Sequence, residues 1–409
     1  MDTLQVSLFF LVSYLISRVF VKLKIPELVV YYLIEKRHIS IQKLTLIIII
    51  GSTLISTIIL NVITVLTLMP LVILLQKEFK STAEDTKKFN TLFLLSVLWG
   101  ANIGGLGMIT GTTTNGILIG LYDLYKIPVG SDFTFISWAA WGLPLAILLS
   151  VIGWLVLILI FKPGKLVHKA DFSRELESAG ISRNLQKKGF YLAICFILTA
   201  SILSYLLGAF AARRVETLVL SGIWTVVFLY LFFLQNWISE DGRKTKLLVI
   251  KDILHNIPKR GLLWMAIAIL ITYLLWQFKF HRFIAEWFVI GFSSKQSILS
   301  LYWIFALLTI FLSEIVSNTA VQFSMFVVLF PMIKINPQMS WQGMLIITLC
   351  SSCAFMTPIA TPSNGLGFGS SGKVSLKYML LSGFVMNIVS AVIIVAWVVF
   401  VVPMVLRFF

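Results

Sequence analysis

Repeated apolar runs, each long enough to cross a lipid bilayer, are the feature that most limits the folds open to this chain. Hydrophobic residues make up 59% of its 409 residues and charged residues 12%, about half the charged share of a soluble domain. We expect full crossings at residues 4–22, 90–122, 135–161, 189–211, 217–236, 261–279, 343–372 and 379–406. The runs therefore predict an all-α membrane protein, because a helix pairs its own backbone polar groups where water is absent.

The formal net charge of +16 would, taken alone, suggest a nucleic-acid partner. The basic residues, however, lie mostly in loops between apolar runs, where the positive-inside rule expects them on the cytosolic side. No module of interleaved basic and aromatic residues accompanies them, so we predict no nucleic acid among the partners. Residues 162–188 are expected to form a cytosolic basic linker. The predicted location is the cell membrane, plasma or inner, with many passes through the lipid bilayer.

Two apolar segments, residues 44–76 and 298–333, are too long for one ordinary crossing. As a single helix, either would run about 50 Å against a hydrocarbon core of about 30 Å. Both carry polar residues near their centres, namely Asn61, Thr64, Ser317, Asn318 and Thr319. We therefore predict two re-entrant hairpins with polar tips at mid-membrane, with two tightly joined full crossings as the alternative.

Each hairpin is followed by a helix whose middle cannot be regular. The first, within residues 90–122, contains "GANIGGLGMITGTTTNGILIG", and the second, within residues 343–372, contains "SSCAFMTPIATPSNGLGFGSSG". Glycine and proline weaken a helix, and non-helical backbone at membrane depth needs surrounding protein or a water-filled cavity. Such breaks offer carbonyl oxygens to Na⁺ and helix N-termini to an anion. The alternative is that the small residues only allow close helix packing.

The order of elements occurs twice along the chain. Residues 4–122 run helix, amphipathic segment, hairpin and interrupted helix, and residues 261–372 follow the same order. Loop charge places the two copies upside down relative to each other. We therefore expect a first inverted repeat at residues 1–161 and a second at 189–409. Inverted repeats with paired broken helices are typical of secondary transporters that bind their substrate near the midplane.

Three motifs resemble one known family. They are "VSNTA" at residues 316–320, "CAFMTPIATPSNG" at 353–365 and "ANIGGLGMITGTTTNG" at 101–116. Together they are similar to the divalent anion/sodium symporters, which carry dicarboxylates, citrate and sulfate. The resemblance covers about residues 40–125 and 260–400. It implies an inverted-repeat, elevator-type transporter with a homodimeric scaffold, a small anionic substrate and Na⁺ as the coupling ion.

The resemblance also implies site residues at the matching positions. Those expected to bind substrate are Asn61, Thr64, Asn115, Ser317, Asn318, Thr319, Pro362 and Asn364. Those expected to bind sodium are Asn61, Gly111, Thr112, Ser313, Val316, Asn318, Ala360 and Thr361. The positions from the first hairpin and first break form a first half-site, to which Thr114 also belongs, and those from the second hairpin and second break form a second half-site.

The chain departs from the family pattern in the first half. Its first hairpin has Leu60, Asn61 and Val62 where the pattern has Ser-Asn-Thr, so two hydroxyls are missing. Its first break lacks the prolines of the second. The second repeat also has two helices, at 189–211 and 217–236, for which the first repeat has no counterpart. The first repeat is therefore expected to be N-terminally shortened.

Glu314 is an acid within a strongly apolar stretch, three residues before Ser317. An intramembrane carboxylate is a functional candidate, so Glu314 either serves coupling, by neutralising a cation or carrying a proton, or hydrogen-bonds within the protein. We expect no enzyme, because no histidine or pair of acids lies at membrane depth. No catalytic metal or other cofactor is predicted. The leading prediction is a sodium-coupled transporter of a divalent anion. The alternatives are a cation/proton antiporter, a metalloid-anion exporter or an electroneutral anion exchanger.

Overall fold

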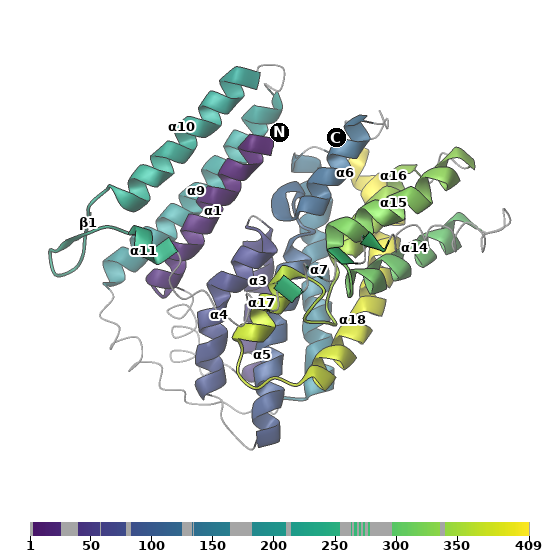
Figure 1. The fold of residues 1–409 in the computed structure, drawn as a ribbon, viewed down its shortest axis with the longest axis horizontal. Coiled ribbons are helices and arrows are strands. Elements are labelled where there is room, and N and C mark those ends of the chain that lie inside the picture. Colours follow the sequence, from purple (N-terminus) through teal and green to yellow (C-terminus); the bar gives the residue numbers. More distant parts are fainter. Residues whose placement is uncertain are drawn as a thin grey trace. The chain divides into compact units, whose positions relative to one another are not determined.

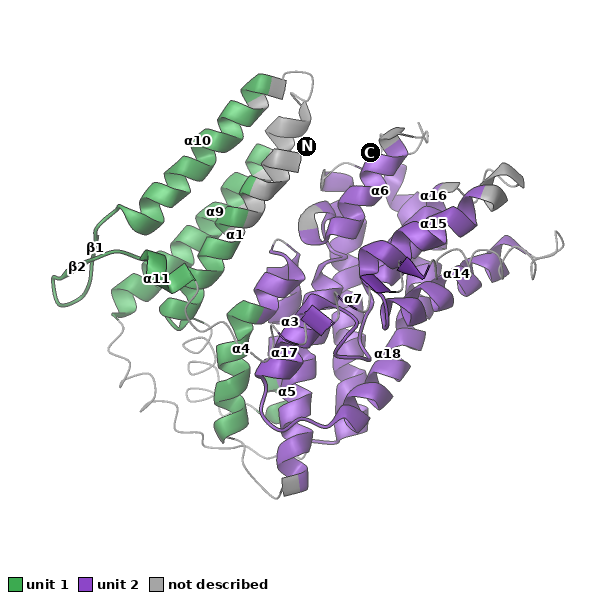
Figure 2. Cartoon of the chain, in the orientation of Figure 1, with its two compact units in different colours: residues 1–44, 66–79, 165–257 green, residues 45–65, 80–164, 258–409 purple. Residues whose placement is uncertain are grey.

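The computed structural model is mostly helical. It describes residues 3–25, 40–57, 59–78, 83–124, 133, 135–163, 182–209, 214–253, isolated positions between 263 and 278, 297–335 and 340–408. The chain forms two compact units, coloured separately in Figure 2. Unit 1 comprises residues 1–44, 66–79 and 165–257, and unit 2 comprises residues 45–65, 80–164 and 258–409.

Unit 1 is built on three helices (Figure 1). They are α1 (Thr3–Lys22), α9 (Arg183–Ala209) and α10 (Arg214–Phe233). α1 packs against both of the others. A short antiparallel hairpin of β1 (Trp237–Ile238) and β2 (Lys244–Thr245) follows, and its turn uses Gly242 at a φ of +71°. The four-residue helix α11 (Ile250–Ile253) then returns the chain to α1.

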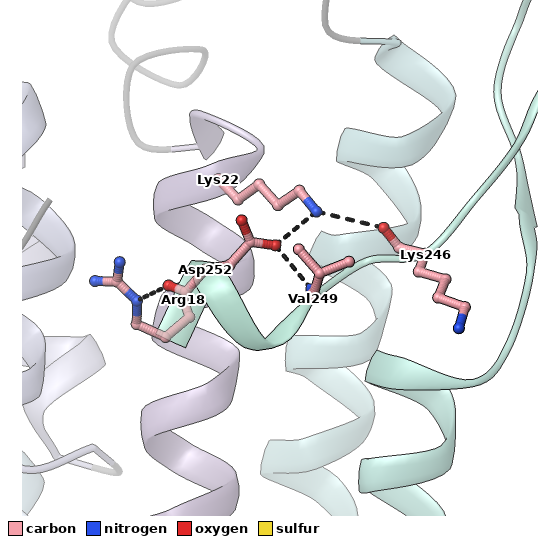
Figure 3. Close-up of polar contacts among 5 residues, drawn as sticks. All are labelled: Arg18, Lys22, Lys246, Val249 and Asp252. Atoms are coloured by element: carbon pink, nitrogen blue, oxygen red, sulfur yellow. Dashed lines mark hydrogen bonds and ion pairs between the residues drawn. The ribbon is translucent and has the colours of Figure 1, made fainter. Parts of the chain in front are cut away.

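Polar contacts hold α1 against the α11 segment (Figure 3). Lys22 Nζ lies 2.8 Å from Asp252 Oδ2, and the same oxygen accepts the Val249 N–H at 2.8 Å. Arg18 Nε donates to the Asp252 carbonyl at 3.0 Å, and the Tyr14 hydroxyl donates to the Ile253 carbonyl at 2.6 Å. Asp252 therefore anchors a helix at the opposite end of this unit's sequence.

Unit 2 contains both hairpin tips and both helix breaks. Its first half runs through α3 (Ile41–Ser56), α4 (Asn61–Glu78), α5 (Ala83–Gly104), η1 (Ile109–Gly111), α6 (Thr113–Leu124) and α7 (Phe135–Phe161). Its second half runs through α14 (Ile298–Ser313), α15 (Asn318–Ile335), α16 (Ser340–Ser351), α17 (Pro362–Ser370), α18 (Leu376–Ala396), a π-helical turn (Trp397–Val401) and α19 (Val402–Leu406). The boundary with unit 1 falls inside α3 and α4.

The helix interruptions lie where the sequence predicts them. Residues 57–60 separate α3 from α4, and residues 314–317 separate α14 from α15. Residues 105–112 and 352–361 interrupt the two following helices, with one short turn, η1, inside the first. The predicted re-entrant depth of the hairpins stays a prediction. The predicted crossing at 261–279 and the linker at 162–188 lie largely outside the described residues.

Large apolar side chains on the outer faces fit a lipid environment. On α7, Ile136, Ile147 and Leu159 are exposed, although this helix also carries the fully buried Trp138 and Trp141. Among the described residues, the helices at 136–161 and 376–406 are long and apolar enough to cross a membrane. An exposed apolar surface of this extent indicates contact with lipid or protein rather than water. The predicted all-α membrane architecture is confirmed at this level.

Two glycines let α3 and α5 approach closely. A Cβ on Gly100 would lie 2.5 Å from the Ile49 carbonyl oxygen, and one on Gly104 would contact the Thr53 carbonyl oxygen. The neighbouring atoms are backbone, so they cannot move aside as a flexible side chain could. Close approach of these two helices brings the first hairpin against the first helix break.

We predict that Gly104→Ala destabilises the protein by about 1–3 kcal/mol, because the added methyl group overpacks a backbone contact. Gly120→Ala is the matched control, since a Cβ there meets nothing within 4 Å. That substitution should be neutral or stabilising by up to about 1 kcal/mol, as expected for glycine replaced within a helix. Thermal unfolding of both purified variants measures the difference. Equal stability of the two would show that α3 and α5 do not pack as described.

Candidate functional site

The first hairpin tip places an asparagine at the start of α4. Asn61 Oδ1 lies 3.0 Å from the Ser56 hydroxyl, which is also 2.7 Å from the Ala101 carbonyl oxygen of α5. Asn61 Nδ2 lies 3.5 Å from Asn102 Oδ1. Thr64 is buried and donates its hydroxyl to the Ile59 carbonyl at 3.3 Å, so it closes the tip's own backbone. Asn61 therefore contacts the following interrupted helix, and Thr64 bonds within the hairpin.

The first break is closed by the side chain of Asn115. Its Nδ2 donates to the carbonyl oxygens of Gly105 at 2.8 Å and Met108 at 2.9 Å, ten and seven residues earlier. Gly111 packs so closely on Gly105 that a Cβ would lie 2.7 Å from the Gly105 carbonyl oxygen. The Trp138 indole donates to the Leu106 carbonyl at 3.0 Å. Three carbonyl groups that a regular helix would have paired are thus satisfied by side chains.

Thr112 is the last residue of the first break, and Thr114 lies in the first turn of α6. Their hydroxyl oxygens are 3.4 Å apart, and the Thr114 hydroxyl is also 3.0 Å from that of Ser352 in the second break. Both threonines are at least nine-tenths buried. These two predicted residues therefore lie together, beside the other half of the unit.

The second break repeats the asparagine clamp. Asn364 Nδ2 donates to the carbonyl oxygens of Ala354 and Thr357, each at 3.0 Å, again ten and seven residues earlier. Thr361 caps α17 by accepting the Asn364 N–H at 3.1 Å, and Pro362 follows as the first helical residue, where its missing N–H costs nothing. Ala360 is buried beside them. The two breaks thus close through the same contacts at the same spacing.

The second hairpin tip lies between α14 and α15, with Asn318 as the first residue of α15. Ser317 Oγ lies 3.4 Å from the Ala320 N–H, and Ser313 donates its hydroxyl to the Ile310 carbonyl at 2.7 Å. Val316 keeps its N–H on the Leu312 carbonyl. The oxygen Asn318 Oδ1 is buried and has no hydrogen-bond partner in the described parts of the chain. Thr319 is partly exposed beside it.

Glu314, the first residue after α14 in this hairpin tip, accepts hydrogen bonds from the second break with its carboxylate. Oε1 accepts the N–H groups of Phe355 at 2.7 Å and Met356 at 2.8 Å, and Oε2 accepts that of Thr357 at 2.7 Å. Asn387 Nδ2 of α18 donates to Oε1 at 2.9 Å. The side chain is 2% exposed. A buried charge needs this degree of pairing, and here three consecutive backbone donors supply most of it.

In the first half, the N–H groups at the corresponding positions of the break have different acceptors. Around the first break, the N–H groups of Leu106 and Gly107 bond to the carbonyls of Ile103 and Gly104 at the end of α5. A Cβ on Gly107 would lie 2.7 Å from a methyl carbon of Thr57, which follows α3 as Glu314 follows α14. Among the described residues, a carboxylate of the hairpin tip therefore accepts hydrogen bonds from the following break in the second half, and Thr57 takes the corresponding position in the first half.

Sequence reasoning missed four polar residues that organise the site: Ser56, Asn102, Gln322 and Asn387. Ser56 lies five residues before Asn61, as Ser313 lies five before Asn318, and this spacing could have identified it. Asn102 lies within the motif at residues 101–116, but its hydrogen-bond partners are far away in the sequence. Gln322 and Asn387 give no sequence signal beyond being polar within apolar helices.

Comparison with known proteins gives these features a family. Paired interrupted helices in an apolar helical chain are typical of secondary transporters. The sodium:sulfate symporter transmembrane region matches residues 4–406, so the chain belongs to this family. The predicted resemblance is thereby confirmed.

Individual relatives carry consistent names. The chain is 26% identical over 338 residues to a sodium-dependent dicarboxylate transporter, SdcS, of Staphylococcus saprophyticus, covering 81% of this chain and 62% of the relative. It is 24% identical over 352 residues to SdcS of Staphylococcus aureus, with the same coverage. An uncharacterized transporter of Haemophilus influenzae is 28% identical over 327 residues, covering 77% of this chain and 64% of the relative. The chain thus spans less than two thirds of the length of these relatives.

We predict that Glu314→Gln lowers the free energy of unfolding by at least about 1.5–3 kcal/mol, the value of one hydrogen bond to a charged group. A glutamine offers one oxygen where the carboxylate offers two, so at least one N–H among residues 355–357 loses its acceptor. Glu240→Gln, at an exposed glutamate, is the control and should change stability little. Thermal unfolding of the purified proteins gives the comparison. A wild-type unfolding temperature for Glu314→Gln would contradict the carboxylate contacts described above.

Proposed function

We propose that this protein is a sodium-coupled secondary transporter of a divalent anion of the dicarboxylate, citrate or sulfate type. The observation that carries the proposal is the repeated pairing of a hairpin tip with an asparagine-clamped helix break, within a chain of the sodium:sulfate symporter family. The names of the relatives from the two staphylococci support sodium as the coupling ion and a dicarboxylate as substrate.

The substrate is proposed to bind at the two hairpin tips. Asn61 and Asn318 are the first residues of α4 and α15, where unpaired N–H groups and the helix dipole favour an anion. Ser317 and Thr319 flank Asn318 with hydroxyls, whereas Leu60 and Val62 flank Asn61. The second half-site is therefore proposed to bind the charged groups of the anion more strongly. Asn115, Asn364, Thr64 and Pro362 complete the proposed substrate set from the breaks and the first hairpin.

Sodium is proposed to bind where oxygen acceptors outnumber donors. Asn318 Oδ1 and Asn115 Oδ1 are buried oxygens without a hydrogen-bond donor in the described parts of the chain, and amide oxygens are suitable ligands for a hard cation. The second half-site would add oxygens from Ser313, Val316, Ala360 and Thr361. The first would use Asn61, Gly111 and Thr112. Glu314 is proposed to support coupling indirectly, by fixing the backbone of the second break.

Transport is proposed to follow an elevator-like alternating-access mechanism built on two inverted repeats, at residues 1–161 and 189–409, within a homodimer. The matching clamp contacts in the two breaks support the repeat. The chain spans less than two thirds of the length of its relatives, and we propose for it the activity, substrate and partners that those whole proteins suggest. An antiporter or an exchanger of the same superfamily is the alternative. Ligand-dependent thermal stability in Na⁺ and in K⁺ distinguishes these functions from sodium-coupled transport.

We predict that succinate, citrate or sulfate raises the thermal stability of the purified protein in Na⁺ but not in K⁺. A ligand at about 100 times its dissociation constant adds about 2.7 kcal/mol to the folded state. Asn318→Ala should abolish this shift, and Asn236→Ala, at an exposed loop position, should retain it. Arsenite and phosphate complete the panel.

Other outcomes would each replace the proposal. Equal stabilisation in Na⁺ and K⁺ would indicate an exchanger or a proton-coupled carrier. A shift with Na⁺ or pH alone, and with none of the anions, would favour the antiporter. Retention of the anion shift in Asn318→Ala would place the substrate away from the second hairpin tip.

A further inference from the structure

In unit 2, the helix that follows each break packs against helices of the other half. α6, which follows the first break, packs on α15 and α16 of the second half. α17, which follows the second break, packs on α5 of the first half. Each break is therefore lined partly by the other half, and the polar contacts across this junction come from a small number of buried side chains.

Asn102 of α5 reaches into the second break. Its Nδ2 donates to the Ala354 carbonyl at 2.7 Å and to Asn364 Oδ1 at 3.1 Å. The same Ala354 carbonyl accepts the clamp bond of Asn364, so the two asparagines and this carbonyl form a closed triangle. Asn102 Oδ1 lies 3.5 Å from Nδ2 of Asn61 at the first hairpin tip, and also 3.5 Å from the Ser363 hydroxyl of α17. One fully buried amide thus contacts the tip of one half and the clamp of the other.

Gln322 of α15 makes the reciprocal contact. Its Nε2 donates to the Thr114 carbonyl in the first half at 2.8 Å and to the Thr348 hydroxyl of α16 at 2.9 Å. Thr114 directly precedes the clamp residue Asn115, and Gln322 lies one helical turn after Asn318, on the same face of α15. Gln322 is also fully buried. Each proposed half-site is therefore tied to the other by an amide that the opposite half supplies.

We propose that Asn102 and Gln322 are positioning residues that make cation occupancy at one helix break depend on occupancy at the other; this rests on the proposed sodium-coupled function. A buried amide satisfies all its partners in one orientation only, so moving one partner weakens the bonds to the rest. A cation bound by Asn115 Oδ1, or by the oxygens of Ala360 and Thr361 just before Asn364, then also fixes the opposite break. The coupling is direct, through the protein, and needs no anion between the tips.

Hydrogen exchange measured by mass spectrometry tests this on the full chain. Exchange is followed at residues 105–112 and 352–361 while Na⁺ replaces K⁺ at constant ionic strength, without anionic substrate. In the wild type we expect Na⁺ to slow exchange at both breaks, with midpoints within about twofold of each other. In Asn102→Ala and, separately, in Gln322→Leu, we expect the two midpoints to differ by about fivefold or more, the lower end of typical coupling factors.

Ser150→Ala is the matched control. It removes a buried hydrogen bond of 2.6 Å between Ser150 and Thr53, which joins α7 to α3 within the first half. This variant should keep a common midpoint even if its stability falls. Gln322→Leu keeps the test decisive if Asn102→Ala fails to fold.

A common midpoint in a folded Asn102→Ala or Gln322→Leu variant would overturn the proposal, and so would different midpoints in the wild type. If Na⁺ slows exchange at neither break of the wild type, the proposed sodium coupling itself fails and this inference falls with it. The wild-type titration alone therefore tells the two failures apart.

Discussion

The need to pair backbone polar groups at the two helix breaks is the constraint on which the rest of unit 2 depends. Where a helix is interrupted within apolar surroundings, each unpaired carbonyl or N–H group costs about 1–3 kcal/mol. Asn115 and Asn364 each satisfy two carbonyl groups, and an indole satisfies a third in both breaks, from Trp138 in the first and Trp99 in the second. The breaks are therefore held in one conformation by side chains.

This arrangement leaves the two halves similar in plan and different in electrostatics. The second break receives a buried carboxylate, Glu314, on three successive N–H groups. The first break closes its N–H groups through its own tight turns and packs a glycine against Thr57. Ser317 and Thr319 also flank the asparagine of the second tip directly, whereas Leu60 and Val62 flank Asn61. A substrate or cation held between these halves would meet a rigid, polar second side and a less polar first side.

The role of Glu314 follows from its neighbours rather than from its burial. An acid in an apolar stretch is compatible with ion coupling and with internal hydrogen bonding, and the sequence leaves both open. Once four N–H donors surround the carboxylate, it has a structural task that accounts for its charge. Its effect on transport would then pass through the geometry of the second break.

The sequence by itself determined the helical membrane class, the hairpin interruptions near Asn61 and Asn318, both helix breaks and the family. The class, the interruptions and the breaks follow from local properties, because apolar length, glycine and proline act within a few residues of where they stand. The family follows from the resemblance of three motifs. Only the tertiary structure decided the partners of Glu314, Asn102 and Gln322. Those partners lie 41 to 73, 41 to 262 and 26 to 208 residues away along the chain, and such contacts depend on how helices pack. Periodicity and composition carry no information about packing at that range.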